Sequence, residues 1–506
     1  MGMMILKNKS GNILSILLAI FALFNISCTR QKNTPQGPVS ELRYGVMSEP
    51  YTLDPLSPTN SADGNSILFN VFEGLVKPDT TGMLLPCIAE SAEMEDLGRS
   101  YYFQLRKNVL FHDGSLLKPA DVKFSLETAA AAGFPGFSAV DKVEIIDDCY
   151  IRVLLKNPDP DFLPYLTVGI VKDGSSNRDK NAVGTGPYYI ESYHTQQSLA
   201  LRKFDKYWRD GVPRLEKISV VFFADADALV LGLHGGSIDG AGLSAALAFQ
   251  LDPQRFDLVP GYSAMVQLLA LNNNVPPLND IRVRQAVNYG INVREIIDTA
   301  FYGAGEPSGS PLIPGLSAYY EPSLADPYPV NRAKALSLLE EAGYGGKNLP
   351  LEITVPSNFT MHVDTAQVIA EQLAAIGITV NIRLIDWASW LSDVYRGRNY
   401  QATIISLDSP NISPRSFLSR YRSDAANNFF NFSNDEFDSV YDSILYEADE
   451  EKRIALYRKA QRIISDNAAN AYIQDILGFK AFRRGSYGGV LNYPLYVIDF
   501  ASMYGM

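Results

Sequence analysis

The chain has 506 residues, of which 46% are hydrophobic and 20% charged, and its formal net charge is -12. These values are typical of a globular protein rather than a disordered or polytopic membrane protein, and the length predicts about three domains. The acidic balance and the lack of clustered Lys and Arg in the sequence argue against a nucleic-acid partner, because phosphate binding needs such clusters.

The chain starts with a lysine-containing segment and an apolar run over residues 13–26, followed closely by Cys28. This run is shorter than the roughly 20 residues that span a bilayer as a helix, so residues 1–28 are interpreted as a signal peptide. The pattern is similar to a bacterial lipoprotein signal in which Cys28 carries the lipid, although Asn25 stands where that signal usually has Leu. Residues 29–41 are polar and contain Pro and Gly, as expected of a flexible tether.

Two further cysteines, Cys87 and Cys149, remain if Cys28 is acylated. Two cysteines are too few for a disulfide framework. A single bridge between them and two separate buried thiols both stay open, since a protein outside the cytoplasm permits either.

The first half of the chain predicts short strands and a few helices. A strand over residues 42–46 leads into a loop, and residues 61–75 carry apolar side chains at helical spacing. Strands rich in aromatic and branched residues between 76 and 181 flank a helix near 120–131, which favours a compact α+β insert. The apolar run over 218–223 is typical of a strand covered on both faces.

The second half predicts a βαβ unit. Its parts are a strand over residues 351–355, an amphipathic helix over 364–376 and a strand over 378–385. Two strands joined by such a crossover helix should be parallel. Residues 401–407 predict another strand, and residues 435–466 predict two helices.

Residues 277–298 predict two short helices set end to end. Asp280 is expected to cap the first helix and lies one helical turn before Arg284, while Asn292 and Glu295 have capping-box spacing at the second. The apolar residues of the first helix are only loosely periodic, which predicts that it is covered on more than one side.

These two helices carry a resemblance to a known family, the extracellular solute-binding proteins of the oligopeptide, dipeptide and nickel type. The matching residues here are Pro277, Asp280, Arg282, Val283, Arg284, Gln285 and Ala286. Further matches follow in the family's order at residues 53–55, 72–75, 105–114, 120–125, 184–188 and 235–239. The resemblance covers nearly the whole mature chain and implies an α/β, two-lobed periplasmic-binding-protein fold with an extra α+β domain and mixed sheets.

In that fold the chain is expected to divide into a discontinuous first lobe, an inserted domain and a second lobe. The expected ranges are 42–75, 186–262 and 480–506 for the first lobe, 76–185 for the insert and 263–479 for the second lobe. Two strand-like crossings near residues 262 and 480 would join the lobes. The apolar and aromatic tail over 487–506 is expected to return to the first lobe.

Catalytic motifs are absent from the sequence. H-E-x-x-H, G-x-S-x-G and G-x-x-x-x-G-K-[ST] do not occur, and the four histidines are widely scattered. His112 stands beside Asp113, but their setting between strand-like segments favours a turn over an acid-base pair. We therefore expect no enzymatic activity, no catalytic residue, no metal site and no cofactor.

Topology points to a ligand site instead, because open α/β sheets bind ligands beyond the carboxyl ends of their parallel strands. Trp387 follows one such strand directly and is predicted to line the cleft, whereas Trp390 continues an apolar face and is expected in the core. The resemblance supports this division, since peptide-binding members have a ligand-contacting Trp at the matching place. The full set of predicted contacts is Tyr51, Tyr262, Trp387, Asp408, Ser409 and Asn411.

In peptide-binding members an Asp four residues before a Pro holds the peptide's α-amino group. Here that place is Pro410, four residues before Pro414, and Asp408 stands two residues earlier. Asp408 is predicted to be the amine anchor, with a turn cap or a pair with Arg415 as the alternative role. Arg415 and Arg420 would favour an anionic group if they faced the site.

The resemblance implies the substrate-binding component of an ABC importer, which captures a peptide or another amine-bearing small molecule between two lobes and delivers it to the permease. The alternatives are a surface lipoprotein of the same fold used for adhesion or sensing, and a binder of a metal chelate or an oligosaccharide. We expect a monomer in the cell envelope, in the periplasm or on the outer surface, held to the membrane through lipid on Cys28.

Overall fold

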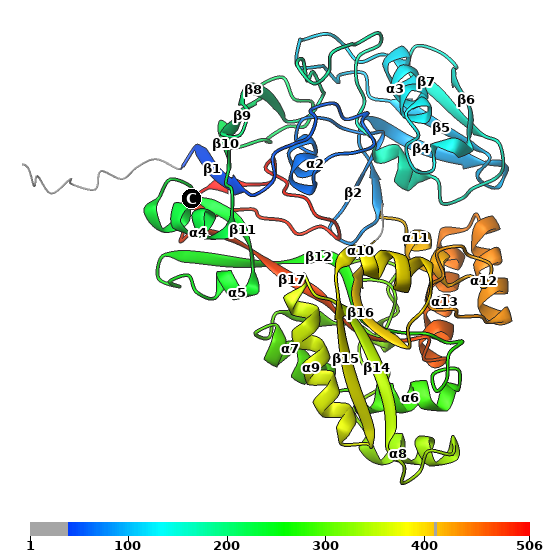
Figure 1. The fold of residues 1–506 in the computed structure, drawn as a ribbon. Helices are drawn as coiled ribbons and strands as arrows, with labels where there is room; N and C mark the ends of the chain where they lie inside the picture. Colours follow the sequence, from blue (N-terminus) through cyan, green and yellow to red (C-terminus); the bar gives the residue numbers. More distant parts are fainter. Residues whose placement is uncertain (1–38, 409–411) are drawn as a thin grey trace, which may run out of the picture. The chain divides into compact units, whose positions relative to one another are not determined.

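The computed structural model describes residues 39–408 and 412–506. Residues 40–506 form one compact unit, and its largest element is an 11-stranded sheet (Figure 1). Along the sheet the strands are β15 (Ile378–Ile385), β14 (Leu349–Pro356), β16 (Ala402–Leu407), β12 (Phe256–Leu271), β17 (Asn470–Arg483), β11 (Gly240–Ser244), β1 (Glu41–Val46), β10 (Lys217–Phe222), β9 (Ser198–Lys203) and β8 (Tyr188–His194). β13 (Gly305–Pro307) pairs with β17 beside this path.

Two long antiparallel strands, β12 and β17, join the two halves of this sheet (Figure 1). They include residues 262 and 480, the two places where crossings are predicted. Tyr262 lies opposite Leu477, and after a register shift Val266 lies opposite Asp475. The shift gives β12 a bulge at residues 263–265, and bulges re-aim the side chains next to them.

Strand β10, in the first half of the sheet, is buried mainly on one face, although the sequence predicts burial on both. β1 pairs in parallel with β10 and β11. In β10 the side chains of Ile218 and Val220 are buried, whereas their neighbours on the other face are partly exposed. The expectation that this strand is covered on both faces is therefore wrong, because β10 alternates as a strand with one solvated face does.

Helix α2 (Ala62–Leu68) is shorter than the helix predicted over 61–75. Ser61 caps its start by accepting a hydrogen bond from the backbone N–H of Gly64. Gly74 does not end a helix. A Cβ at Gly74 would lie 2.6 Å from the carbonyl oxygen of Leu166, so this glycine permits a close backbone approach.

A separate four-stranded sheet is formed by residues that lie between α2 and β8 in the sequence. Its order is β4 (Ala89–Glu95), β5 (Ser100–Leu105), β7 (Tyr150–Leu155) and β6 (Val140–Ile145), and all its pairs are antiparallel. Helix α3 (Pro119–Ala131) packs on β6 and β7. This sheet falls inside the range 76–185 of the predicted insert, while the domain boundaries themselves stay a prediction.

The βαβ unit of the second half has the predicted arrangement. β14 and β15 are parallel, and α9 (Thr360–Ala374) lies between them in the chain and packs on both. β16 pairs in parallel with β14 and antiparallel with β12, so the unit continues into the crossing strands. Helix α9 begins at Thr360, earlier than predicted, and this extension brings its first turn to the site described below.

The two helices set end to end are α6 (Ile281–Gly290) and α7 (Val293–Ala300). Asp280 caps α6, but it pairs with Arg282 rather than Arg284. The Arg284 guanidinium is buried and donates to the carbonyl oxygens of Leu278, Ala468 and Asn467, at 2.9, 3.1 and 3.0 Å. Burial lowers the pKa of Arg284 to about 10. Arg284 thus holds a chain turn in place rather than completing a helical charge pair.

The remaining α-helices and the short strand pairs are distributed over both halves of the chain. The helices are α4 (Ala226–Gly235), α5 (Ala245–Ala248), α8 (Arg332–Glu341), α10 (Trp387–Ser389), α11 (Pro414–Leu418), α12 (Asp435–Tyr446) and α13 (Glu450–Asp466), with a π-helical stretch over Trp390–Arg396. The short strand pairs are β2 (Val76–Pro78) with β3 (Leu84–Pro86), and β18 (Tyr487–Gly488) with β19 (Tyr504–Gly505). Within the described residues, no helix has the length and apolar character needed to cross a bilayer.

The C-terminal tail returns to the first half, as predicted. The Asn70 side chain, just after α2, donates to the carbonyl oxygen of Ile498 at 2.9 Å and accepts from the backbone N–H of Phe500 at 2.8 Å. The backbone N–H of Ile498 also donates to the Ser66 hydroxyl at 2.8 Å. These buried bonds fix the tail beside α2, where it can form part of a cavity wall.

Candidate functional site

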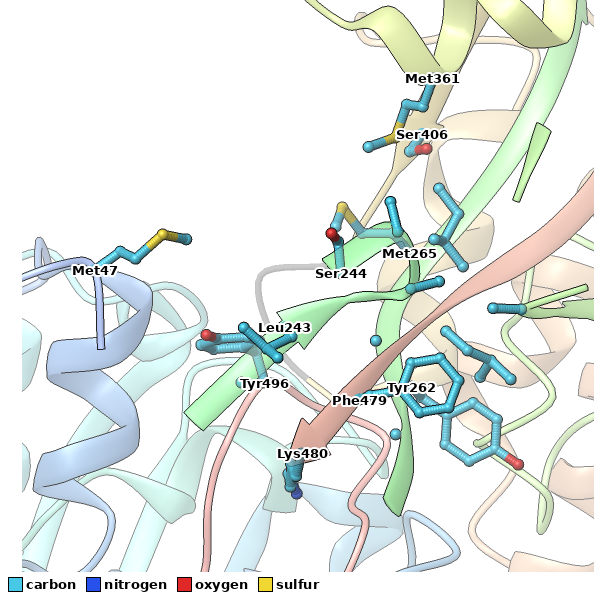
Figure 2. Close-up of a pocket in the computed structure, with 18 of the residues that line it drawn as sticks. Met47, Leu243, Ser244, Tyr262, Met265, Met361, Ser406, Phe479, Lys480 and Tyr496 are labelled. Atoms are coloured by element: carbon cyan, nitrogen blue, oxygen red, sulfur yellow. The ribbon is translucent and has the colours of Figure 1, made fainter. Parts of the chain in front are cut away.

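A cavity of about 760 Å³ opens beside the crossing strands β12 and β17, and we call it the first cavity. Its walls come from these strands, from β11, from the first turn of α9, from Trp387 and from the C-terminal tail. Figure 2 shows Tyr262 on β12, Phe479 and Lys480 on β17, and Met361 at the start of α9 around this space. The volume falls within the roughly 300–1,000 Å³ typical of small-molecule sites.

The lining of the first cavity is mainly apolar and aromatic. Its larger side chains include Met47, Leu243, Met265, Phe359 and Phe479. A solute that enters this cavity can therefore bury a large apolar surface, at about 25 cal/mol for each Å² removed from water.

Trp387 presents its ring to the first cavity. Its indole stacks on Trp390 with ring centroids 5.0 Å apart and an interplanar angle of 4°, and Phe359 meets it edge-on at 5.5 Å. Trp387 is 39% exposed, whereas Trp390 is 2% exposed and donates its indole N–H to the Thr403 hydroxyl at 2.9 Å. Trp390 thus lies in the core, as predicted, while solute contact by Trp387 stays a prediction.

Tyr262 lines the same cavity from β12, beside the bulge. The bulge also directs Met265 toward the cavities, since Met265 lines both the first cavity and the second one described below. Burial raises the pKa of Tyr262 above its usual value, so its hydroxyl stays protonated at neutral pH. Tyr262 can then donate a hydrogen bond to a solute.

A buried neutral network supports the first turn of α9. His362 Nδ1 lies 3.1 Å from Gln267 Nε2, and Gln474 Nε2 donates to Gln267 Oε1 at 2.8 Å. Gln267 Nε2 also donates to the Thr365 hydroxyl at 3.1 Å. Burial lowers the pKa of His362 to about 4, so this histidine is uncharged at neutral pH. The network joins α9 to both crossing strands without a buried charge.

A second cavity of about 660 Å³ adjoins the first, because both are lined by Met265, Leu495, Tyr496 and Val497. Its other walls include Phe72, Glu73, Cys87 and Phe417. The Glu73 carboxylate is buried and accepts from the Tyr207 hydroxyl at 2.6 Å and from the Trp208 indole at 3.0 Å. The two cavities together offer room for a solute longer than either.

Asp408 lies at a different cavity from the predicted contacts Tyr262 and Trp387. It is exposed and lines the second cavity rather than the first. Arg420 donates to the backbone carbonyl oxygen of Asp408 at 3.1 Å. The described structure thus puts Asp408 at a cavity, and its role as an amine anchor stays a prediction.

Tyr51 is far more exposed than a cleft residue should be. Its side chain is 79% exposed, and it lines neither cavity. The structure therefore gives the predicted contact at Tyr51 no support, because this loop turns outward after β1, with the Tyr51 N–H bonded to Asn60. Ser409, Asn411 and the lipid-bearing candidate Cys28 lie outside the described residues.

Arg415 cannot serve an anionic solute in this structure, which corrects one expectation. Its guanidinium forms two hydrogen bonds with Asp159, at 2.5 and 2.9 Å, and its Nε lies 3.6 Å from Asp161. Both carboxylates belong to the loop that follows β7 of the four-stranded sheet. The alternative pair between Asp408 and Arg415 is therefore also wrong, since Arg415 is already bound to two other carboxylates.

His112 binds backbone groups, and Cys87 and Cys149 do not form a disulfide. His112 Nδ1 accepts from the backbone N–H of Gly184 at 3.1 Å, and its Nε2 lies 3.0 Å from the Gly186 carbonyl oxygen, as suits the predicted turn. Cys87 is buried and Cys149 partly buried, and both are free thiols here. The described residues contain no cluster of His, Cys, Asp and Glu that could hold a metal ion.

Several residues of the first cavity were missed by reasoning from the sequence. Met265 had no signal, because a bulge depends on strand pairing. Tyr496 lies in a tail whose return was expected but whose exact neighbours were not. Lys480 did have a signal, since it is a lone lysine in the apolar and aromatic run 476–482.

Comparisons with known proteins agree with this architecture. A family model for bacterial extracellular solute-binding proteins, family 5, middle region, matches residues 84–429. Heme-binding protein A of Haemophilus influenzae is 28% identical over an alignment of 438 positions, gaps included, and the alignment covers 78% of this chain and 79% of that protein. The probable deoxycholate-binding periplasmic protein YgiS of Escherichia coli is 27% identical over an alignment of 479 positions, gaps included, and the alignment covers 86% of this chain and 88% of that protein.

The fold is shared with a solved structure of low sequence identity. The crystal structure of the ABC transporter substrate-binding protein CtaP from Listeria monocytogenes aligns with a TM-score of 0.80 at 23% identity. The alignment covers 93% of this chain and 100% of that one. At this identity the likeness establishes the fold alone, which is the two-lobed α/β fold of periplasmic binding proteins.

Proposed function

Because the chain belongs to the bacterial extracellular solute-binding proteins of family 5, it is a solute-binding protein, and we propose that it captures a large, mainly apolar solute in the first cavity. The protein then delivers this solute to the permease of an ATP-driven importer. The observation that supports the proposal is the apolar cavity of about 760 Å³ at the crossing strands, with the partly exposed indole of Trp387 in its wall.

The character of the solute follows from the lining. Stacked rings and methionines suit a body with flat or flexible apolar surfaces, because aromatic faces and thioethers pack on many shapes. Two relatives are named for heme and for deoxycholate, which both have such bodies, and another is named for peptide transport. Peptides with apolar side chains and amphipathic organic molecules are accordingly the two solute classes that we propose.

Capture follows from lobe closure about β12 and β17. Closure would remove water from the first cavity and strengthen each hydrogen bond to the solute. Adhesion or sensing remains the competing role for a surface protein of this fold.

Native mass spectrometry of the purified protein tests the proposal. A solute that survives purification should appear as a mass excess that disappears on denaturation. Its addition should raise the free energy of unfolding by RT ln(1 + [L]/Kd). A protein that carries no solute and gains no stability from peptides, bile acids or porphyrins would contradict solute capture and favour adhesion.

We also propose that the protein is monomeric and held at the membrane by lipid on Cys28. The support is the sequence alone, namely a short apolar run that ends just before Cys28. Cys28→Ser should release the protein into the soluble fraction of cells, whereas Cys149→Ser should leave it with the membrane. Retention of the Cys28→Ser protein at the membrane would count against the lipid anchor.

A further inference from the structure

The described lining of the first cavity has a single lysine or arginine, Lys480 on β17, and the other basic residue of that lining, His362, is neutral at neutral pH. Figure 2 shows Lys480 on the same strand as Phe479, at the side of the cavity formed by the crossing strands. The partners of Lys480 on the neighbouring strands are Val259 on β12 and Gly242 on β11, neither of which is charged. Lys480 is thus a cation within a largely apolar surface.

The ammonium group of Lys480 contacts neutral oxygen atoms only. It donates to the carbonyl oxygen of Leu491 at 3.0 Å and to Asn492 Oδ1 at 3.3 Å. No ion pair of Lys480 occurs within the described residues. Because an ammonium has three N–H donors, these two bonds leave one donor for a solute.

The acidic groups near the cavity already have other partners. Asp63 accepts from the backbone N–H of Ser48 and from the Tyr496 hydroxyl, each at 2.9 Å. Asp499 accepts from the Tyr493 hydroxyl at 2.8 Å and lies 3.8 Å from the Lys77 ammonium. The remaining acid of the lining, Asp364, is exposed on α9. Asp499 acts on Lys480 through its charge, but no carboxylate among the described residues forms an ion pair with Lys480, so a solute carboxylate can supply a close counterion.

We propose that Lys480 binds a carboxylate on an otherwise apolar solute and thereby selects acidic solutes over neutral ones of the same shape. This inference rests on the proposed function, since it requires that the first cavity holds the solute. Two sources supply the chemistry, namely the C-terminal carboxylate of an apolar peptide and the acid group of an amphipathic molecule such as a steroid acid.

The selectivity has a physical cause in desolvation. A neutral solute would cover the ammonium without offering it a charged partner, and burying an unpaired charge is costly. A carboxylate in its place forms a charge-assisted hydrogen bond, which is roughly twice as strong as a neutral one. The first cavity can therefore bind an acid and reject its amide or ester.

The proposal also predicts how affinity depends on pH. Burial lowers the pKa of free Lys480 to about 8, and a bound carboxylate must raise this pKa. Affinity for an acid is then highest below about pH 8 and falls as the pH rises above that value, because binding needs the protonated amine. The charged group that acts on Lys480 is Asp499 in the tail, which raises the Lys480 pKa against the effect of burial. Tyr262 and Tyr493 line the same cavity. Burial raises the pKa of both tyrosines above the usual value, so they do not lose a proton in this window.

The test compares acids with their neutral analogues on the purified full chain. The probes are deoxycholate against its methyl ester, and a mixture of apolar tripeptides against the same tripeptides with C-terminal amides. Calorimetry and native mass spectrometry give the affinities between pH 6.5 and 9.5. We expect one acid class to bind at least about tenfold more tightly than its neutral analogue at pH 7, and the class that does so identifies the source of the carboxylate.

Variants of Lys480 assign the selectivity to this side chain. Lys480→Met keeps the length of the stem and should abolish both the preference for the acid and the pH dependence, while Lys480→Arg should retain the preference. The matched control is Lys217→Met, because Lys217 lies on β10 of the same sheet, pairs with Glu191 and lines neither cavity. Unfolding midpoints show whether each variant is folded.

The outcomes separate this inference from the proposed function. Equal affinity for acids and neutral analogues, in wild type and in Lys480→Met, overturns the role of Lys480 and leaves solute capture intact. Failure of both acids to bind overturns it as well. The comparison of acid with neutral analogue and its pH profile need no variant, so they decide the question even if Lys480→Met does not fold. Solute capture itself fails only if the native protein also carries no solute and no compound stabilises it.

Discussion

The walls of the two cavities are held by different forces. Beside the first cavity, Trp387 stacks on Trp390, and α9 is tied to β12 and β17 by the uncharged network of Gln267 and His362. Beside the second cavity, Glu73 is buried among hydrogen-bond donors, and α11 is held by ion pairs from Arg415 to Asp159 and Asp161.

This difference separates residues that serve the fold from residues that face a solute. The buried charges of Glu73 and Arg415 near the second cavity have several partners each, so they stabilise packing between distant segments of the chain. The partly exposed ring of Trp387 and the amine of Lys480 instead have capacity left for a bound molecule. A buried charge is thus a poorer guide to a binding site here than an incompletely covered side chain.

The largest expected effect comes from the ion pairs of Arg415. Arg415→Met leaves Asp159 and Asp161 without their cation, and removing one partner of a buried pair costs about 3–5 kcal/mol. Urea unfolding should show this decrease in the free energy of unfolding. Arg422→Met is the control, because the partners of Arg422 are largely exposed, so it should cost under about 1 kcal/mol. A loss of similar size in both variants would contradict the structural role of Arg415.

Asp408→Asn tests whether the second cavity also contributes a charge to binding. Asparagine keeps the shape of the side chain and removes its charge, so affinity for a solute with an amine should fall by about 2–5 kcal/mol. Titration of the co-purified solute gives the value, with Asp148→Asn in the turn between β6 and β7 as the exposed control. An affinity within about threefold of wild type would end the role of Asp408 as an anchor.

We expect the folded protein to lose stability in acid, because the network beside the first cavity contains a buried, neutral His362. The pKa of His362 is lowered from 6.5 to about 4 in the folded protein, so the unfolded chain binds more protons between these values. Stability attributable to His362 is therefore full above about pH 6.5 and is lost as the pH falls toward 4, by about 3 kcal/mol in all. Burial lowers the pKa of His112 to about 4 as well, so both histidines contribute to this window.

His362→Gln removes one of these two contributions. Urea unfolding between pH 4 and 7.5 should show a shallower decline for His362→Gln than for wild type. His194→Gln is the control, because His194 is exposed at the end of β8. An unchanged decline in His362→Gln would mean that His362 is not held neutral by burial.

The smallest expected effect comes from the exposed ring of the stacked pair. Trp387→Ala should weaken solute binding by about 1–3 kcal/mol with a smaller effect on folding, as for a hot-spot aromatic. Trp390→Ala, which empties a core position, should instead reduce stability by about 3–5 kcal/mol. Calorimetry and urea unfolding on both variants measure the difference. If Trp387→Ala loses a full core-aromatic amount of stability and keeps its affinity, Trp387 belongs to the core.

Local patterns in the sequence predicted much of the fold. The βαβ unit follows from the hydrophobic period of its strands and helix, and the caps Asp280 and Asn292 lie where their side chains can reach free backbone N–H groups. The prediction failed where a distant segment intervenes. Gly74 looked like the end of a helix, but its small size permits a close approach to the backbone at Leu166. Arg284 looked like the helical charge partner of Asp280 but binds the carbonyl oxygens of Asn467 and Ala468.

The sequence by itself determined the βαβ unit, the partly exposed place of Trp387 and the core place of Trp390, because these depend on strand ends and spacing within one segment. Only the tertiary structure decided that Met265, Lys480 and Tyr496 share a cavity. Met265 reaches the cavity through the bulge in β12, Lys480 through strand β17, and Tyr496 through the returning tail. The two strands pair although they lie some 200 residues apart in the sequence, as Gln267 opposite Gln474 shows. Contacts over such separations depend on how whole segments pack, and no local pattern of residues encodes that arrangement.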